Sequence, residues 1–148
     1  MVLVMWLRIA IAAFVVLELT NVVTLYMAPG SRRANGVGVF TEWEASRADP
    51  EIHAFVRYLV YWVAGTKLIF LGLLLAILAT APDRTTIAAG GVIAISIASF
   101  FWRLYPLARG MDRRGRMEPA GYSTVLGVMI GVMVAVLGIG TAGAALTS

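Results

Sequence analysis

The sequence predicts an all-α membrane protein, a single domain over residues 1–148 in which four transmembrane helices form an antiparallel, up-and-down bundle. Two observations of composition and one of pattern predict this fold. Of the 148 residues, 60% are hydrophobic and 14% are charged, whereas about a quarter of a soluble domain is charged. The mean hydropathy is +0.86. Long apolar runs alternate with short segments that hold nearly all the charge, as expected for a chain whose solvent is lipid.

The first span is expected over about residues 4–27, a length that suits the ~20 residues needed to cross the hydrocarbon layer. It should end at Pro29–Gly30, a helix stop signal. The second span is expected over about 55–80. Its helix should begin earlier, because the segment Asp49–Glu51 combines an N-cap residue, a first-turn proline and a first-turn acid. Those early turns would then project from the membrane.

The third span is expected over about residues 86–105, closed by Pro106, and the fourth over about 122–146, in a stretch rich in glycine and alanine. The polar segment between the first two spans has a middle, Val37–Trp43, that suits a short interfacial helix or a re-entrant turn with Phe40 and Trp43 at the headgroups. An ordered loop anchored by these two aromatic residues is the alternative.

The basic residues predict the orientation. Nine arginines lie in or beside the two long loops, whereas Arg8 and Arg84 are the basic residues near the opposite ends of the spans. The positive-inside rule therefore puts both long loops in the cytoplasm and both termini outside. The abundance of alanine, glycine and arginine suits a bacterium of high genomic GC content, so the expected location is the bacterial cytoplasmic (inner) membrane.

Composition also excludes several kinds of site. The chain has no cysteine and one histidine, which excludes thiolate chemistry, Cys-based zinc sites and a His-rich metal centre within one chain. No metal and no cofactor are expected, and no catalytic motif is present. The net charge of +4 does not predict nucleic-acid binding, because the basic residues lie beside apolar spans, where anionic headgroups are the expected partners.

Two ionisable residues stand out deep within the predicted spans, and each needs a reason because such groups cost about 2.5–3.5 kcal/mol at a helix centre. Glu18 and Lys67 fall at similar depths in antiparallel helices, by a rise of 1.5 Å per residue. We expect them to pair, either as a structural lock or as a switchable proton or ion site. Asn21 and Thr24 follow Glu18 at spacings of three and extend this polar site along one face.

Two further surfaces are predicted. Gly127, Gly131 and Ala135 repeat at spacings of four and include a GxxxG motif, which lets helix backbones approach closely. This face should serve packing within the bundle or a homo- or hetero-oligomer. A basic, aromatic rim at the end of the third span and in the loop that follows is expected to contact anionic lipid; its arginines are Arg103, Arg109, Arg113, Arg114 and Arg116.

The first helix resembles one known family. The run Met5–Ala10, followed by Leu17–Thr20, is similar to the opening helix of the small multidrug resistance transporters. The resemblance implies a four-helix dimer with a glycine-rich fourth helix, and Glu18 would match the family's proton-coupled glutamate. It covers only this helix and the GxxxG motif. The long charged first loop, the buried Lys67 and the large basic third loop depart from the family, and Lys67 would neutralise the acid that such transporters titrate.

Three functions are compatible with these patterns. The first is an accessory, anchoring or assembly subunit that works by binding within a larger membrane complex. The second is a proton- or ion-coupled carrier of small molecules that uses Glu18 and Lys67. The third is a lipid- or quinone-modifying enzyme with chemistry around His53, Glu42 and Arg57. The missing catalytic constellation favours binding over catalysis.

Overall fold

The computed structural model describes residues 2–147, and this part of the chain is all-helical, as predicted. Within it, four helical segments are long and apolar enough to cross a membrane: 2–27, 50–80, 83–113 and 122–146. The 83–113 segment consists of three consecutive helical pieces. In chain order the elements are α1 (Val2–Met27), η1 (Val37–Val39), α2 (Thr41–Ser46), α3 (Pro50–Thr80), α4 (Asp83–Ala98), η2 (Ser99–Phe101), α5 (Leu104–Arg113) and α6 (Tyr122–Leu146).

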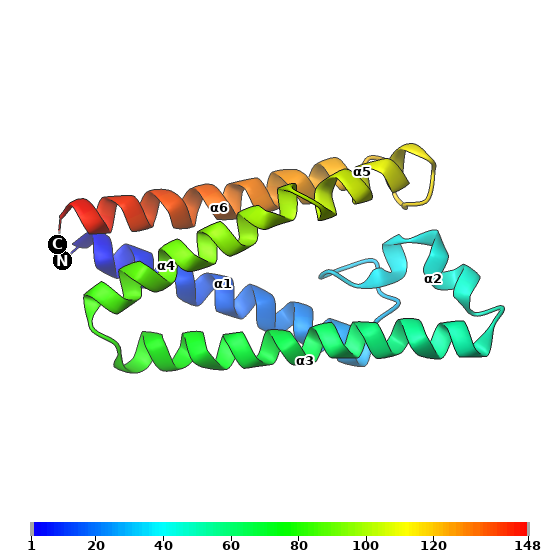
Figure 1. Cartoon of the computed structure of the whole chain (residues 1–148), viewed down its shortest axis with the longest axis horizontal. Helices are drawn as coiled ribbons and strands as arrows, with labels where there is room; N and C mark the ends of the chain where they lie inside the picture. Colours follow the sequence, from blue (N-terminus) through cyan, green and yellow to red (C-terminus); the bar gives the residue numbers. More distant parts are fainter. Residues whose placement is uncertain (1, 148) are drawn as a thin grey trace.

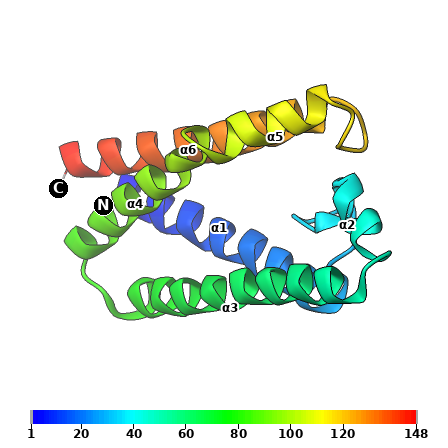
Figure 2. The ribbon, with the colours of Figure 1, turned by 45° about the vertical axis from the view of Figure 1, so that its right-hand side comes forward.

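The long helices lie along one axis, with both termini and the short α3–α4 turn at one end and the two long loops at the other (Figures 1 and 2). α1 is the central helix, because it contacts α3, α4 and α6. α4 packs along α6, whereas α3 makes most of its contacts with α1. α3 is therefore held to the rest of the bundle chiefly through α1.

Both ends of α3 are capped by side chains. Asp49 accepts hydrogen bonds from the backbone N–H groups of Glu51 (3.0 Å) and Ile52 (3.2 Å), so the predicted N-cap is confirmed. At the other end, Arg8 of α1 donates to the carbonyl oxygens of Leu78 (3.0 Å) and Ala81 (2.8 Å). A cation at a helix C-terminus also complements the helix dipole. The same guanidinium lies 3.2 Å from the carboxylate of Asp83, at the start of α4.

The end of the third span differs from the prediction. The α-helix ends at Ala98, passes through the 3₁₀ turn η2, and resumes as α5 beyond the expected stop. Pro106 lies in the first turn of α5, where a residue without an N–H is tolerated because that N–H would have no helical partner. The proline therefore belongs to the start of a new helix rather than to the end of the span.

Small residues allow α1, α4 and α6 to pack closely. Gly90 of α4 is buried, and a Cβ added there would lie 2.6 Å from Oγ1 of Thr141 on α6 and 3.0 Å from Cδ1 of Leu7 on α1. Leu7 is fully buried. Thr141 is β-branched, so its side chain has little freedom to move away.

We predict that Gly90→Ala lowers the free energy of unfolding by about 1–3 kcal/mol, because the added methyl group overpacks a three-helix contact. Thermal unfolding in mild detergent measures the effect. Gly72→Ala on α3 is the matched control, since nothing lies within 4 Å of the place that its added Cβ would take. Equal unfolding temperatures for the two variants would contradict close packing at Gly90.

Candidate functional site

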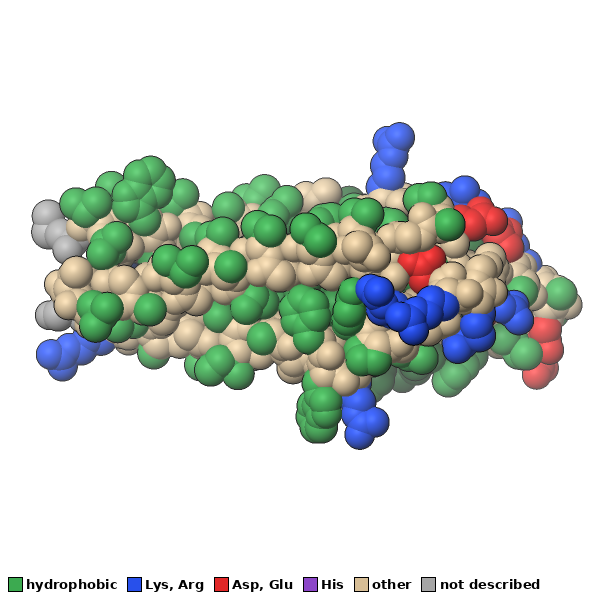
Figure 3. All heavy atoms as spheres, turned by 90° about the horizontal axis from the view of Figure 1, so that it is seen from above, with side chains coloured by type: hydrophobic (Ala, Val, Ile, Leu, Met, Phe, Trp, Pro, Cys, Tyr) green, Lys and Arg blue, Asp and Glu red, His purple; other side chains and the backbone are tan. Residues whose placement is uncertain are grey.

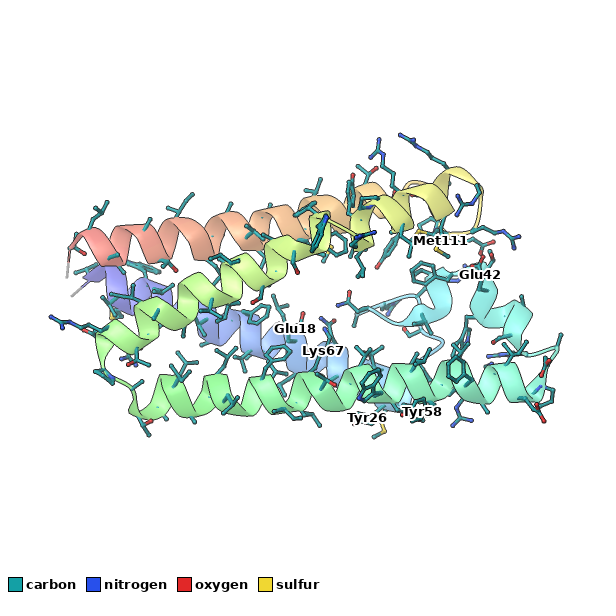
Figure 4. The ribbon with its side chains drawn as sticks, viewed as in Figure 1. Glu18, Tyr26, Glu42, Tyr58, Lys67 and Met111 are labelled. Atoms are coloured by element: carbon teal, nitrogen blue, oxygen red, sulfur yellow. The ribbon has the colours of Figure 1, made fainter. Side chains whose placement is uncertain are left out.

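The predicted polar site lies between α1 and α3, near the middle of the bundle (Figure 4). Nζ of Lys67 contacts Oε2 of Glu18, and the other carboxylate oxygen, Oε1, accepts a hydrogen bond of 3.0 Å from Nδ2 of Asn21. The side chains of Lys67 and Glu18 are 22% and 16% exposed. Both oxygens of the carboxylate thus have a partner, and the two formal charges compensate each other.

The fourth predicted member of this site lies apart from it. Oγ1 of Thr24 donates to the carbonyl oxygen of Thr20, one turn earlier in the same helix, at 3.0 Å. This is the usual local use of a helical threonine. The polar cluster therefore consists of Glu18, Asn21 and Lys67.

Two pairs of aromatic rings flank the cluster along the α1–α3 contact. Phe14 stacks with Phe70 at a centroid distance of 6.4 Å toward the α3–α4 turn, and Tyr26 stacks with Tyr61 at 5.7 Å toward the loops. The charged contact is thus enclosed between two apolar contacts of the same helix pair. In such surroundings each charge depends strongly on the other, because removing one leaves the other without compensation.

The segment after α1 folds back toward the bundle. Figures 1 and 2 show its tip directed into the space between α3 and the α4–α5 segment. Val37 packs against the same core cluster as the long helices, and the N–H of Val37 donates to the carbonyl oxygen of Pro29 at 2.8 Å. Of the alternatives that the sequence left open, the segment contains short helices, η1 and α2.

Trp43 does not lie where the sequence placed it. Its side chain is only 4% exposed, and its indole ring covers Gly30 and packs against the ring of His53 at a centroid distance of 4.7 Å. A residue at the headgroups would be exposed on the outer surface. Burial against these two residues instead fixes α2 on the first turns of α3, and this replaces the expected role of Trp43 as a membrane anchor.

The two long loops form one unit, which we call the cap and define as residues 28–49 and 114–121. An isolated antiparallel β-bridge joins Phe40 and Met117. The N–H of Thr41 donates to the carbonyl oxygen of Arg116 (3.1 Å), and that of Glu118 donates to the carbonyl oxygen of Val39 (2.8 Å).

Charged and apolar side chains reinforce this joint. Arg32 pairs with Glu118 at 2.6 Å and Arg116 with Glu42 at 3.8 Å. A small buried cluster lies beneath these pairs and consists of Val39, Ala108 and Met117, with Phe40, Met111 and Tyr122 packed against it. Sequence reasoning missed the joint, because no local pattern links segments so far apart in the chain.

His53 has a serine partner that sequence reasoning also missed. Nδ1 of His53 lies 2.8 Å from Oγ of Ser46, a spacing compatible with a nucleophile and its base. However, Ser46 is only 7% exposed, and its hydroxyl donates to the carbonyl oxygen of Trp43 at 2.8 Å. Because its single proton is used there, the serine oxygen accepts from Nδ1–H. The contact orients the imidazole and offers no accessible nucleophile.

Three of the acids near His53 in the sequence have other partners. Glu42 pairs with Arg116, Glu44 pairs with Arg47 at 3.3 Å, and Asp49 caps α3. Among residues 2–147, no group of three or more His, Asp or Glu side chains is placed to hold a metal ion. Glu42, which the enzyme hypothesis grouped with His53, therefore pairs with Arg116.

The glycine face of α6 divides between two environments. A Cβ on Gly127 would lie 2.6 Å from Cε2 of Tyr105, and one on Gly131 would lie 3.8 Å from Cζ of Phe101. The GxxxG pair thus faces aromatic side chains of its own chain. Ala135, by contrast, is exposed and lines a shallow groove between α1 and α6.

The predicted lipid-contact arginines fall into different environments. Arg103 lies over the ring of Trp102 and Arg109 over the ring of Tyr105. Arg116 faces Glu42 across the cap. Arg113 and Arg114 are exposed at the end of α5 and just after it. Figure 3 shows the charged side chains gathered at this end of the molecule, next to a long hydrophobic surface.

Comparisons with protein-family models, with curated proteins and with solved structures give no match to this chain. The chemistry of its own side chains is therefore the basis for proposing a function.

We predict that Lys67→Met lowers the free energy of unfolding by about 3–5 kcal/mol, because it leaves Glu18 charged and uncompensated. The double variant Glu18→Gln/Lys67→Met should recover most of this loss, since a neutral glutamine still accepts from Asn21. Thermal unfolding in detergent compares the two. Equal destabilisation of the single and double variants would show that the charges do not depend on each other.

Proposed function

We propose that this chain works by binding, as an accessory, anchoring or assembly subunit of a larger complex in the bacterial cytoplasmic membrane. The excess of arginine around the cap supports an orientation with the cap in the cytoplasm and both termini outside. In this role the chain is a multi-pass protein that needs no catalytic site of its own. Its partner is another membrane helix, from a different subunit or from a second copy.

The groove between α1 and α6 is the observation that carries this proposal. Small side chains line it from both helices, and larger apolar residues border it; the residues are Trp6, Ile9, Ala10, Ala13, Val132, Ala135, Val136, Ile139 and Gly140. In lipid, helices associate where small residues let backbones approach, because apolar surface alone gives no preference for protein over lipid. A groove of this composition suits an added helix.

The use of polar groups inside the chain also supports a binding role. Glu18 and Lys67 face each other, three glutamates of the cap face arginines, and the serine beside His53 is buried. A catalytic site needs at least one reactive group that is free to meet a substrate. These polar groups instead hold helices and loops in place.

A proton- or ion-coupled carrier is the second candidate, and the partial exposure of Glu18 and Lys67 favours it. Ionisable residues within membrane spans commonly mark ion pathways. In this mechanism a proton or cation would displace Lys67 from Glu18. The segment after α1, residues 28–40, would control the access of that ion to Glu18 from the cap side.

For the binding proposal, we predict that Ala135→Leu removes a stoichiometric partner, because the larger side chain fills the groove. The tagged protein is extracted from its host in mild detergent, and co-purifying chains are identified by mass spectrometry. Val125→Leu is the matched control on an exposed position of the same helix outside the groove. A partner that stays bound to the Ala135→Leu variant would rule out the groove as its site.

For the carrier mechanism, we predict that the double variant Glu18→Gln/Lys67→Met, which leaves no uncompensated charge, abolishes ion-coupled uptake into proteoliposomes while it remains folded, since an amide cannot exchange a proton at this position. Uptake is measured against wild-type protein under an imposed proton gradient, and far-UV circular dichroism checks the fold. Uptake at the wild-type rate would exclude Glu18 as the coupling group.

A further inference from the structure

Six of the nine arginines at the loop end of the molecule have a charged or aromatic partner, and Arg33, Arg113 and Arg114 form no salt bridge among residues 2–147. Three of the six face acids, in Arg32–Glu118, Arg47–Glu44 and Arg116–Glu42. Three others lie over aromatic rings: Arg57 over Tyr61 (5.5 Å to the centroid), Arg103 over Trp102 (5.4 Å) and Arg109 over Tyr105 (6.0 Å). Within residues 2–147, none of these three forms a salt bridge with a carboxylate. We call them the ring-stacked arginines.

Two of these arginines lie at the end of a stretch of about 20 residues counted from the α3–α4 turn. The α3–α4 turn fixes one membrane boundary, and about 20 residues, or about 30 Å, span the hydrocarbon from there. This count ends near Val60 on α3 and at Arg103 after α4. Arg57 lies three residues further out, which is about 4.5 Å. Each therefore follows a stretch long enough to cross the hydrocarbon, and we expect both at the opposite boundary, in or beside a headgroup layer about 5–7 Å deep.

The remaining arginines of α5 lie further from the hydrocarbon. By the same rise, Arg109 is about 9 Å beyond Arg103, just past the outer edge of the headgroups and within reach of its own long side chain, and Arg113 is about 15 Å beyond Arg103. Figure 3 shows that basic side chains gather where the long hydrophobic surface of the molecule ends. Aromatic residues near Arg57 and Arg103 in the chain are exposed: Tyr58 (61% exposed), Trp62 (64%) and Trp102 (75%).

We infer that Arg57 and Arg103, with Arg109 at the outer edge, form a phosphate-binding ring for anionic phospholipids in the headgroup layer on the cap side. Each guanidinium lies 5.4–6.0 Å from the centroid of an aromatic ring, and the N–H donors that it does not use within the chain can bind phosphate oxygens. The tyrosine hydroxyls orient two of them: Arg57 donates to Tyr61 at 3.0 Å and Arg109 to Tyr105 at 2.9 Å.

The lipid site inferred here differs from the one predicted from the sequence. It includes Arg57, which no sequence pattern grouped with the third loop, and it leaves out Arg116, which faces Glu42. Arg113 and Arg114 are also separated from the headgroup layer. This inference goes beyond the proposed binding function, because lipid binding by these arginines needs no protein partner. The lipid site and the partner-binding groove can therefore fail their tests independently.

The test compares two charge-matched variants. Arg57→Gln/Arg103→Gln removes two ring-stacked arginines, and Arg113→Gln/Arg114→Gln removes two that lie beyond the headgroups. All four side chains are exposed, so both variants should fold, which far-UV circular dichroism checks. Each protein is titrated with phosphatidylglycerol and, separately, with phosphatidylcholine in detergent, and native mass spectrometry gives the Kd of the bound lipid.

We expect Arg57→Gln/Arg103→Gln to weaken phosphatidylglycerol binding about fivefold for each arginine removed. The control pair should retain nearly wild-type affinity. Equal losses in the two variants would overturn the inference, because they would mean that net charge alone attracts the lipid. Unchanged phosphatidylglycerol affinity in Arg57→Gln/Arg103→Gln would overturn it as well. So would a wild-type affinity for phosphatidylcholine equal to that for phosphatidylglycerol. So would full competition by inorganic phosphate at low millimolar concentration, which would identify a site for a free anion.

Discussion

The contact between Glu18 and Lys67 is the interaction on which the rest of the structure depends. α3 is held to the bundle mainly through α1, and this contact lies between the two stacked ring pairs that join these helices. A lone charge at this depth would cost about 2.5–3.5 kcal/mol, so sliding α3 along α1 by one turn would leave two uncompensated charges. The pair therefore fixes the register of α3.

The position of the cap follows from that register. α2 packs on the first turns of α3 through Trp43 and His53, while the other half of the cap continues into α6. Asp112 at the end of α5 accepts from the N–H groups of Gly121 and Ser123 and so holds the start of α6. A shift of α3 would move α2 away from the β-bridge between Phe40 and Met117. Helix register and loop structure are thus linked.

Local signals predicted much of this fold. Apolar length indicated the four long helices, the Asp49–Glu51 segment indicated the start of α3, and depth counting put Glu18 opposite Lys67. The rest depends on contacts between segments distant in the chain. An aromatic residue at a membrane boundary has the same local pattern whether it faces lipid or protein, so burial of Trp43 and packing of Tyr105 on Gly127 could not be read from sequence. For the same reason, the arginines could not be sorted by partner.

The pairing of Glu18 with Lys67 is tested most directly by the through-space coupling between 15Nζ of Lys67 and 13Cδ of Glu18, measured by solid-state NMR on the protein in lipid bilayers. We expect a strong dipolar coupling, with chemical shifts of an ammonium and a carboxylate at neutral pH. The absence of coupling, or the shifts of a neutral amine and a protonated carboxyl group, would contradict this pairing. In that case another contact would have to hold α3 in register on α1.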